Sequence, residues 1–323
     1  MKFAEAQLDT YSQPLSATED QMCKNAIGMV RDALKPLGFS DNNRSITTLF
    51  PDTYAYSLEL SSIAGRKIKL FVQGSYANNT NVRTESDVDI AVVQEETFTT
   101  HYRSSSSYPQ SDADYHFITA NPAAKSFKDE VQECLESKFG KDVERKNKSI
   151  KVYGNTYRKD ADSVPCRRYR DYSNDFRKDV NNFVGGIIIV CDDGKQIINY
   201  PEQHIENGRK KNIATNHHYK KYVRIIKKMR YLMEDARISS ASTVSSFGLE
   251  SLLWNIPDNW YIENCKYRKV FNFQQLINYL CSHYADIPTY KEVNGIKQLC
   301  PDSTVAAAYK NFVVALKDFY SYE

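Results

Sequence analysis

The stretch that decides the fold is "FVQGSYANNTNVRTESDVDIAVV", residues 71–93. An apolar strand breaks at Gly74-Ser75, and the next apolar strand carries two carboxylates, Asp87 and Asp89. Residues two apart on a strand point to the same face, so the two carboxylates project together. Because neighbouring carboxylates repel, such a pair is favourable when a divalent metal ion lies between them. An isolated D-x-D is more often a solvated strand edge than a metal site, so the choice between the two depends on the surrounding residues.

The Gly74-Ser75 turn favours the metal-site interpretation. A Gly-Ser turn directly after a strand lets backbone N–H groups approach a phosphate closely, and a short helix expected over "YANNTNV" opens at the same point. Either feature alone is common in ordinary turns. A strand, a Gly-Ser turn, about a dozen residues and a D-V-D strand together predict a triphosphate-binding turn beside a metal site.

The composition is that of a globular chain. Its 323 residues are 41% hydrophobic and 26% charged, enough for one large domain or two closely packed ones. The longest apolar run, at 183–191, is far shorter than the roughly 20 residues of a membrane helix. The N-terminus lacks a signal-peptide core, and the seven cysteines form no C-x-x-C pair. We therefore expect a soluble, reduced, cytoplasmic protein without a membrane partner.

The spacing of apolar residues predicts an α/β half followed by a helical half. A capping box at Ser16 and Glu19 starts a predicted helix over 17–35. Asn121-Pro122 is typical of a helix start, and that helix is expected to run to about residue 139. The remaining predicted elements are strands at 67–73, 86–94, 149–153, 156–164, 183–190 and 195–199, and helices at 217–236, 245–255, 272–284 and 303–320.

Two segments interrupt this pattern. Residues 99–118 hold four consecutive serines and a proline, which predicts a polar loop that is either a mobile flap or a disordered insertion. Residues 200–216 are polar and rich in helix breakers, and the boundary between the halves is expected there. The predicted domains are 1–205, with helix 17–35 bracing both lobes, and 206–323.

The composite around the Gly-Ser turn resembles the signature of the polymerase-β-like nucleotidyltransferase superfamily. Within it, "QGSYANNT" (73–80) and "SDVDIAVV" (86–93) are most similar to the bacterial cGAS/DncV-like nucleotidyltransferases, which make cyclic oligonucleotide second messengers in anti-phage defence. The resemblance implies an α+β fold: a polymerase-β-like nucleotidyltransferase core with a mixed β-sheet, a C-terminal helical lobe and an active-site cleft between them.

The same resemblance implies a third carboxylate on a later strand. The family follows it with a small segment ending in proline, and "RKDADSVPCRRY" (158–169) fits that pattern at Asp162. Asp160 lies two residues away on the same strand face, so the choice rests on the position of the proline. Without the upstream motif, this segment would be read as a strand end that enters a turn.

The helical half carries further matches to the family. "YKKYVRIIKKMRYL" (219–232) resembles its V-R-x-x-K helix and implies that Lys227 reaches the triphosphate, together with Gln73, Gly74 and Ser75. "VSSFGLESLLWNIP" (244–257) resembles a helix start at which Ser246 contributes a hydroxyl; a plain N-cap is the other interpretation. Lys220 and Arg224 share the face of Lys227, and a solvated basic face would explain them equally well. Four residues form the opposite, core-facing stripe: Tyr222, Ile226, Met229 and Met233.

The implied chemistry is nucleotidyl transfer assisted by two Mg²⁺ ions, with Mn²⁺ able to substitute. Asp87 and Asp89 would hold both ions, and Asp162 would complete the one that binds the attacking ribose hydroxyl. The substrates are NTPs, and the product is a cyclic di- or trinucleotide formed with release of pyrophosphate. The partners of the protein would be a downstream effector, reached through the cyclic product, and optionally a regulatory protein.

The net charge of the chain helps to choose among alternative functions. A net charge of +3 does not suggest the broad basic surface of a template-directed polymerase or tRNA-modifying enzyme, so nucleic-acid binding is not expected to be required. One alternative is an RNA- or small-molecule-directed nucleotidyltransferase. Another, of a different class, is a non-catalytic nucleotide-binding or scaffold protein. Three intact aspartates argue against the second, since degenerate members of the family usually lose a carboxylate.

Overall fold

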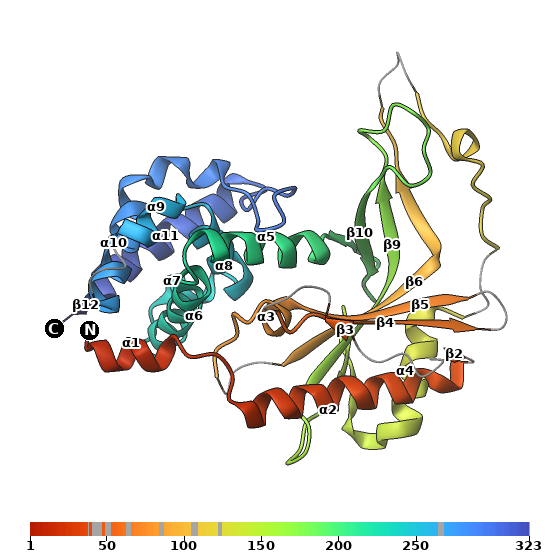
Figure 1. The fold of residues 1–323 in the computed structure, drawn as a ribbon, viewed down its shortest axis with the longest axis horizontal. Coiled ribbons are helices and arrows are strands. Elements are labelled where there is room, and N and C mark those ends of the chain that lie inside the picture. The colour runs from red at the N-terminus through yellow and green to blue at the C-terminus, as the bar shows by residue number, and fades with distance from the viewer. Residues whose placement is uncertain are drawn as a thin grey trace.

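The computed structural model has two lobes, a sheet half and a helical half, linked by helix α5 (Figure 1). It describes residues 1–37, 39–40, 47–48, 53–62, 66–83, 87–104, 109–121, 125–263 and 268–322. Across these ranges, no helix is both long enough and apolar enough to cross a bilayer. The mixed sheet followed by a helical part confirms the predicted fold class.

The sheet is built around β6 (Val88–His101). This strand runs parallel to β9 (Ala161–Asp171) and antiparallel to β5 (Lys67–Gln73). The strand order is β11-β10-β9-β6-β5-β4-β2, with β3 paired to β4 and the β7–β8 hairpin joined to β9. The bounds of the other strands are β2 Phe39–Ser40, β3 Thr47–Thr48, β4 Tyr56–Ser62, β7 Val143–Arg145, β8 Ile150–Val152, β10 Val184–Val190 and β11 Gln196–Asn199.

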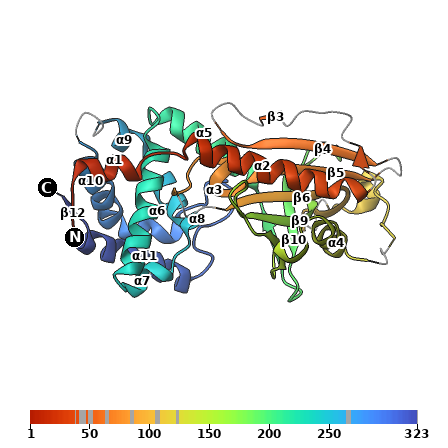
Figure 2. The same cartoon turned by 90° about the horizontal axis from the view of Figure 1, so that it is seen from below.

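The two faces of β6 have different neighbours. Val88, Ile90 and Val92 pack in a core with helices α2 (Ala17–Leu34) and α4 (Phe127–Phe139). Figure 2 shows both helices against the strands. Ala91 and Val93 face the other side, in a core formed with β9 and β10. Since Asp87 and Asp89 alternate with the first set, they belong to this second face.

The helical lobe packs around α6 (Tyr219–Asp235). The predicted stripe on this helix is confirmed, since all four of its residues are buried in one core. That core also takes in Phe3 and Leu8, because α1 (Glu5–Tyr11) packs there and β1 (Lys2–Phe3) pairs with β12. The other elements of the lobe are α7 Ser239–Ser242, α8 Ser246–Trp254, α9 Asp258–Glu263, α10 Lys269–Ser282, η5 Tyr284–Thr289, α11 Ser303–Phe319 and β12 Ser321–Tyr322.

Several predicted boundaries were wrong. The helix expected from Asn121 begins at Phe127, where Ser126 accepts a hydrogen bond from the backbone of Asp129 and acts as the cap; Pro122 lies outside the described residues. The strand expected from 156 begins at 161. The segment 200–216 does join the lobes, but most of it forms a helix that was not predicted, α5 (Pro201–Ala214), whose proline occupies the first helical turn, where no N–H is needed.

The predicted polar loop at 99–118 lies at the far end of β6 from Asp87 and Asp89. The strand continues to His101 after an irregularity between Gln94 and Phe98. Beyond it, Tyr115 is buried and its hydroxyl donates to Asp175 over 2.7 Å. Residues 105–108 lie outside the described part. The domain boundary at 205/206 and the bracing role of helix 17–35 stay predictions.

Gly186 on β10 provides a test of this architecture. A Cβ atom there would lie 2.8 Å from the backbone oxygen of Asn199 and 3.1 Å from the ring of Tyr200, where β11 leads into α5. Gly186→Ala should therefore destabilise the protein by about 1–3 kcal/mol, the range for overpacking, and lower its melting temperature. Gly28→Ala is the control, since nothing lies within 4 Å of a Cβ on this α2 residue. A lower melting temperature for the control alone would contradict the packing described.

Candidate active site

Three strands bring polar groups into one row. Asp89 on β6 pairs in register with Asp162 on β9 on one side and with Gln73 on β5 on the other. Asp87 is the residue directly before β6, two residues before Asp89. The structure therefore brings the three predicted aspartates to one edge of the sheet, although they come from segments more than 70 residues apart in the sequence.

The Gly74 turn lies directly on Asp89. Gly74 has a φ of +71°, and it opens the four-residue helix α3 (Gly74–Ala77). A Cβ at this position would lie 2.3 Å from Asp89 Oδ2, so both the backbone conformation and the space require glycine. The turn is fixed by its own hydrogen bonds: Asn78 Nδ2 donates to the oxygen of Gly74 over 3.0 Å, and Thr80 N donates to that of Ser75 over 2.9 Å.

The carboxylates carry negative charge that is incompletely balanced. Burial, followed by the charges of Asp162 and Asp87, raises the pKa of Asp89 to about 7. Burial also raises the pKa of Asp162, although Ser149 Oγ donates to it over 3.0 Å. A divalent cation favours the ionised form of such groups, and carboxylate oxygens are the ligands that Mg²⁺ takes.

The donor set thus fits a divalent cation in charge and chemistry, but the side chains do not form a closed site. Within the described ranges, no three His, Cys, Asp or Glu side chains are close enough together to hold a metal ion. The three carboxylates would have to draw together around such an ion.

Lys151 is a site residue that the sequence did not reveal. Its Nζ lies 2.8 Å from Asp87 Oδ2 and 2.8 Å from Asp160 Oδ2. β8 positions it, because Lys151 pairs with Asp162 across the β8–β9 ladder. The alternation of residues in the predicted strand 149–153 shows on which face of that strand Lys151 lies, but it does not show with which strand 149–153 pairs. Asp160 is thereby occupied, since it also accepts from the backbone N–H of Gly154 over 2.6 Å.

A cavity of about 350 Å³ lies in front of this row and is lined by both halves of the molecule. The sheet half contributes Asp89 and the turn residues Gln73 and Gly74, whereas α8 and the 291–298 loop contribute Phe247 and Glu292. The other lining residues are Asn78, Lys148, Ile197, Asn199, Tyr200, Pro201, His204 and Asn294. The cavity has the size and two-sided position expected of a cleft for a small substrate.

Three of the predicted triphosphate residues, Ser75, Lys227 and Ser246, do not line this cavity. Lys227 is buried, 3.0 Å from Glu250 Oε2, and donates to Thr80 Oγ1 over 3.1 Å. Ser246 is the first residue of α8, and the cap is Ser245, whose hydroxyl accepts from the backbone of Gly248 over 3.0 Å. The role of Lys227 and Ser246 at the triphosphate therefore stays a prediction.

The basic face of α6 is not solvated. Lys220, Arg224 and Lys227 are all buried. Arg224 donates to two backbone oxygens, that of Ser12, directly after α1, and that of Asn79, just after α3. Burial lowers the pKa of Arg224 to about 10. This face of α6 thus contacts the sheet half, through Arg224 at Asn79 and Lys227 at Thr80.

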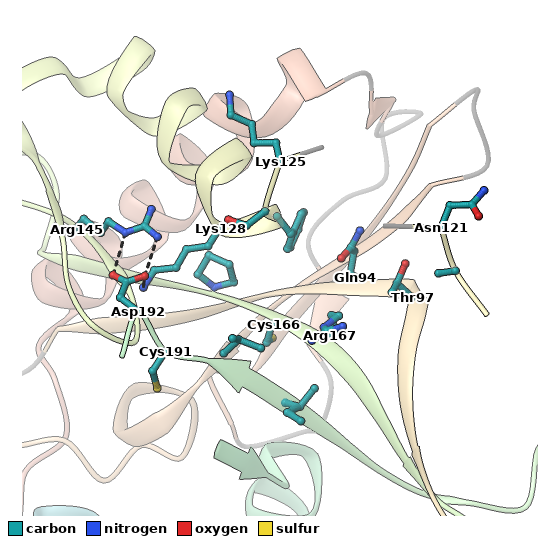
Figure 3. A pocket seen from close by; sticks show the side chains of 16 residues that line it. Gln94, Thr97, Asn121, Lys125, Lys128, Arg145, Cys166, Arg167, Cys191 and Asp192 are labelled. Carbon is teal, nitrogen blue, oxygen red and sulfur yellow. Dashed lines mark hydrogen bonds and ion pairs between the residues drawn. The ribbon is translucent and has the colours of Figure 1, made fainter. Parts of the chain in front are cut away.

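A larger cavity, of about 640 Å³, contains none of the predicted site residues (Figure 3). It lies beside the start of α4, on the face of the sheet opposite Asp89. All three basic side chains at its α4 end are already paired: Arg145 and Lys128 lie 2.7 Å and 3.0 Å from Asp192, and Lys125 pairs with Glu133. We therefore place the candidate active site at the smaller cavity, which Asp89 lines beside the Gly74 turn.

Comparison with known proteins identifies both halves. Residues 56–159 match the family model of the nucleotidyltransferase domain. Residues 206–321 match that of the cGAS/DncV-like nucleotidyltransferase C-terminal helical domain.

Relatives are similar over nearly the whole chain. The cyclic GMP-AMP synthase CdnE03 of Staphylococcus schleiferi is 45% identical, with 100% of this chain and 98% of that protein covered. The cyclic dipurine nucleotide synthase of Elizabethkingia meningoseptica is 34% identical over 91% of this chain and 89% of that one.

Solved structures share the fold. The Elizabethkingia meningoseptica CdnE cyclic dinucleotide synthase with GTP and Apcpp has a TM-score of 0.70 and 31% identity, with 99% of this chain and 100% of that one covered. The Rhodothermus marinus CdnE c-UMP-AMP synthase with Apcpp and Upnpp has a TM-score of 0.71 and 25% identity, with 98% and 97% covered. The resemblance found in the Gly-Ser turn and the D-V-D strand is thus confirmed, and the chain belongs to the cGAS/DncV-like nucleotidyltransferase family of cyclic nucleotide synthases.

Proposed function

We propose that this protein joins two NTPs into a cyclic dinucleotide and releases pyrophosphate at each of two nucleotidyl-transfer steps. The observation that carries the proposal is the in-register pairing of Asp89 with Asp162 beside the Gly74 turn. The relatives support the product class, because those from Staphylococcus schleiferi and Rhodothermus marinus are named for cyclic GMP-AMP and cyclic UMP-AMP synthesis.

The cofactor that we propose is a pair of Mg²⁺ ions, with Mn²⁺ as a substitute, held by Asp87, Asp89 and Asp162. When bound, divalent cations lower the pKa of the attacking ribose hydroxyl and neutralise the departing pyrophosphate. The third carboxylate is assigned to Asp162 rather than Asp160, since Asp162 pairs in register with Asp89, whereas Asp160 accepts from the N–H of Gly154.

The chain's own groups would then bind and orient the substrates. Backbone N–H groups at Gly74 and Ser75 would bind phosphate oxygens next to the carboxylates, because a glycine turn lets the backbone come close. The exposed ring of Phe247, at the helical side of the cavity, offers a surface on which a base can stack. After the first transfer, the linear dinucleotide would turn over in the same cleft and be closed into a ring.

The buried ion pair between Lys227 and Glu250 would hold the turn against the helical lobe. Both residues bond to Thr80, at 3.1 Å and 2.9 Å, and Thr80 closes the turn through its bond to Ser75. Glu250 also lies 3.1 Å from His204 Nε2, and His204 lines the cavity. A residue on each of three helices and the turn thus share one polar cluster.

In the cell, we propose that the product is a second messenger in a bacterial anti-phage defence of the CBASS type. The cyclic nucleotide would activate a downstream effector, and a regulatory protein could control the synthase. Survival of phage-infected cells with and without this protein would test the proposed role in defence.

Labelled NTPs, incubated singly and in mixtures with Mg²⁺ or Mn²⁺, test the proposed reaction. We expect phosphatase-resistant small products and pyrophosphate. Asp89→Asn or Asp162→Asn should reduce the rate at least about 100-fold, because even outer-shell partners of a metal contribute 10–100-fold. Asp160→Asn should retain most activity. Equal losses for Asp160→Asn and Asp162→Asn would overturn the assignment of the third carboxylate, and labelling of added RNA or of a small acceptor would overturn the reaction.

A second test concerns the contact between Gly74 and Asp89. Gly74→Ala should abolish pyrophosphate release, because the new methyl group would lie within 2.3 Å of Asp89 Oδ2. Gly194→Ala is a matched control: Gly194 also has a positive φ, +80°, but nothing lies within 4 Å of a Cβ there. Both variants carry the backbone strain of roughly 1–2 kcal/mol, so only the first should lose activity. Comparable activities would contradict the role of the turn.

A third test concerns the buried ion pair. Lys227→Met should lower the melting temperature strongly, since breaking a buried pair by removing one partner costs about 3–5 kcal/mol. Lys228→Met, on the next residue of α6 and half-buried, should leave it nearly unchanged. The apparent KM for NTP separates the two possible roles of Lys227. A KM increase without loss of stability would support triphosphate contact rather than lobe positioning.

A further inference from the structure

We propose that Glu292 makes the cavity selective for guanine, by accepting hydrogen bonds from the N1–H and the 2-amino group of the base of one substrate. The inference rests on the proposed function, since it names the base for the same cleft. Glu292 belongs to the loop at 291–298 that follows η5 and lines the cavity from the helical lobe. Its side chain is only 15% exposed.

The position of the negative charges limits what Glu292 can face. Among the described residues that line the cavity, only Asp89 and Glu292 carry carboxylates. Asp89 lies with Asp87 and Asp162 at the sheet edge, where the triphosphate and cations belong. A second carboxylate on the opposite wall would repel a triphosphate, because like charges disfavour each other strongly at short range in a cleft. Glu292 is therefore matched to an uncharged part of the substrate that donates hydrogen bonds.

Guanine is the base that fits such a group. An ionised carboxylate only accepts hydrogen bonds, and its two oxygens can accept side by side. The Watson–Crick edge of guanine presents two adjacent donors, N1–H and the 2-amino group. Adenine, cytosine and uracil each place an acceptor beside their donor, so a carboxylate facing them would meet a lone pair. Two parallel bonds to a charged acceptor add both affinity and orientation.

The carboxylate is held in place before a ligand arrives. Asn294 Nδ2 donates to Glu292 Oε2 over 2.6 Å, and Lys297 Nζ lies 3.7 Å from Oε1. Each oxygen keeps acceptor capacity, because a carboxylate has about four lone-pair positions. Asn294 also caps the turn by accepting from the backbone N–H groups of Ile296 and Lys297. Such a fixed acceptor binds without first losing side-chain freedom.

The loop is also fixed to its surroundings on both sides of the cavity. Asn255 on the helical side exchanges two hydrogen bonds with the backbone of Lys291, at 2.8 Å and 3.2 Å. Lys297 Nζ reaches across to the sheet half and donates to the backbone oxygen of Ile198 over 3.1 Å. Asn207 on α5 donates to the oxygen of Val293 over 2.9 Å. Direct bonds therefore hold the loop that carries Glu292 to Asn255, to α5 and to β11.

Equilibrium binding tests the inference without turnover. Calorimetry with Ca²⁺ in place of Mg²⁺ would measure the dissociation constants of GTP, ATP and ITP. ITP differs from GTP only in lacking the 2-amino group. The wild type should bind GTP at least about tenfold more tightly than ITP, the factor that corresponds to one bond to a charged group. Glu292→Gln should weaken GTP binding at least about tenfold, change ATP binding less than about twofold, and remove the difference between GTP and ITP.

Lys297→Met is the matched control. It removes the ion pair of Glu292 and the bond to Ile198 but leaves the carboxylate, so the preference for GTP over ITP should remain. Loss of that preference in Lys297→Met would mean that Glu292 acts through the loop. Equal weakening of GTP and ATP by Glu292→Gln would point to a ribose contact, and a wild type that binds ITP as well as GTP would overturn the inference outright.

The outcomes also separate this inference from the proposed function. Cyclic products without guanosine, made from other NTPs, would leave the reaction intact and sink the role of Glu292. If the protein bound GTP selectively but released no pyrophosphate, the role of Glu292 would be supported and the proposed reaction would be contradicted.

Discussion

Electrostatic repulsion among three aspartates held at one sheet edge is the constraint on which the site depends. β6 and β9 fix Asp89 and Asp162 side by side through backbone hydrogen bonds, so neither side chain can relieve the repulsion by moving to another strand. The sheet can hold them there because both of its faces bury apolar side chains, which stabilise the strands independently of the charges. The partial compensation comes from Lys151, and it reaches Asp87 rather than Asp89.

The same edge explains why the chain uses glycine next to the carboxylates. β5 ends one residue before Gly74, and the turn that follows must pass over Asp89 at contact distance. A side chain there would either displace the carboxylate or push the turn away from it. The acidic row and the backbone turn are thus one structure, in which the position of each determines the position of the other.

Local patterns in the sequence were sufficient for this part of the molecule. Strand alternation around Asp87 and Asp89, the capping box at Ser16 and the apolar stripe of α6 each depend on residues close together in the sequence, and the structure confirms the elements that they predict. The family resemblance supplied the prediction that Asp162 is the third carboxylate, because spacing alone could not choose between Asp160 and Asp162.

What could not be predicted depends on pairing between distant segments. Lys151 reaches the site only because β8 pairs with β9, and the sequence of β8 does not name its partner. The basic face of α6 is buried because a second lobe covers it, whereas helical periodicity alone is equally consistent with a solvated face. The helix at 201–214 was not predicted within the segment that joins the lobes, because its polar composition outweighed a proline that suits a first turn.

The buried cluster at Thr80, Lys227 and Glu250 has a consequence for motion. Separating the lobes at this seam would strip a charged pair of its partners without giving it full access to water. Rotation is therefore easiest about an axis that runs through the cluster, so that its bonds stay intact while the outer rims swing apart. The hydrogen bond from Lys297 to Ile198, which joins the 291–298 loop to β11, would cost less to break, so such a rotation would widen the cleft there.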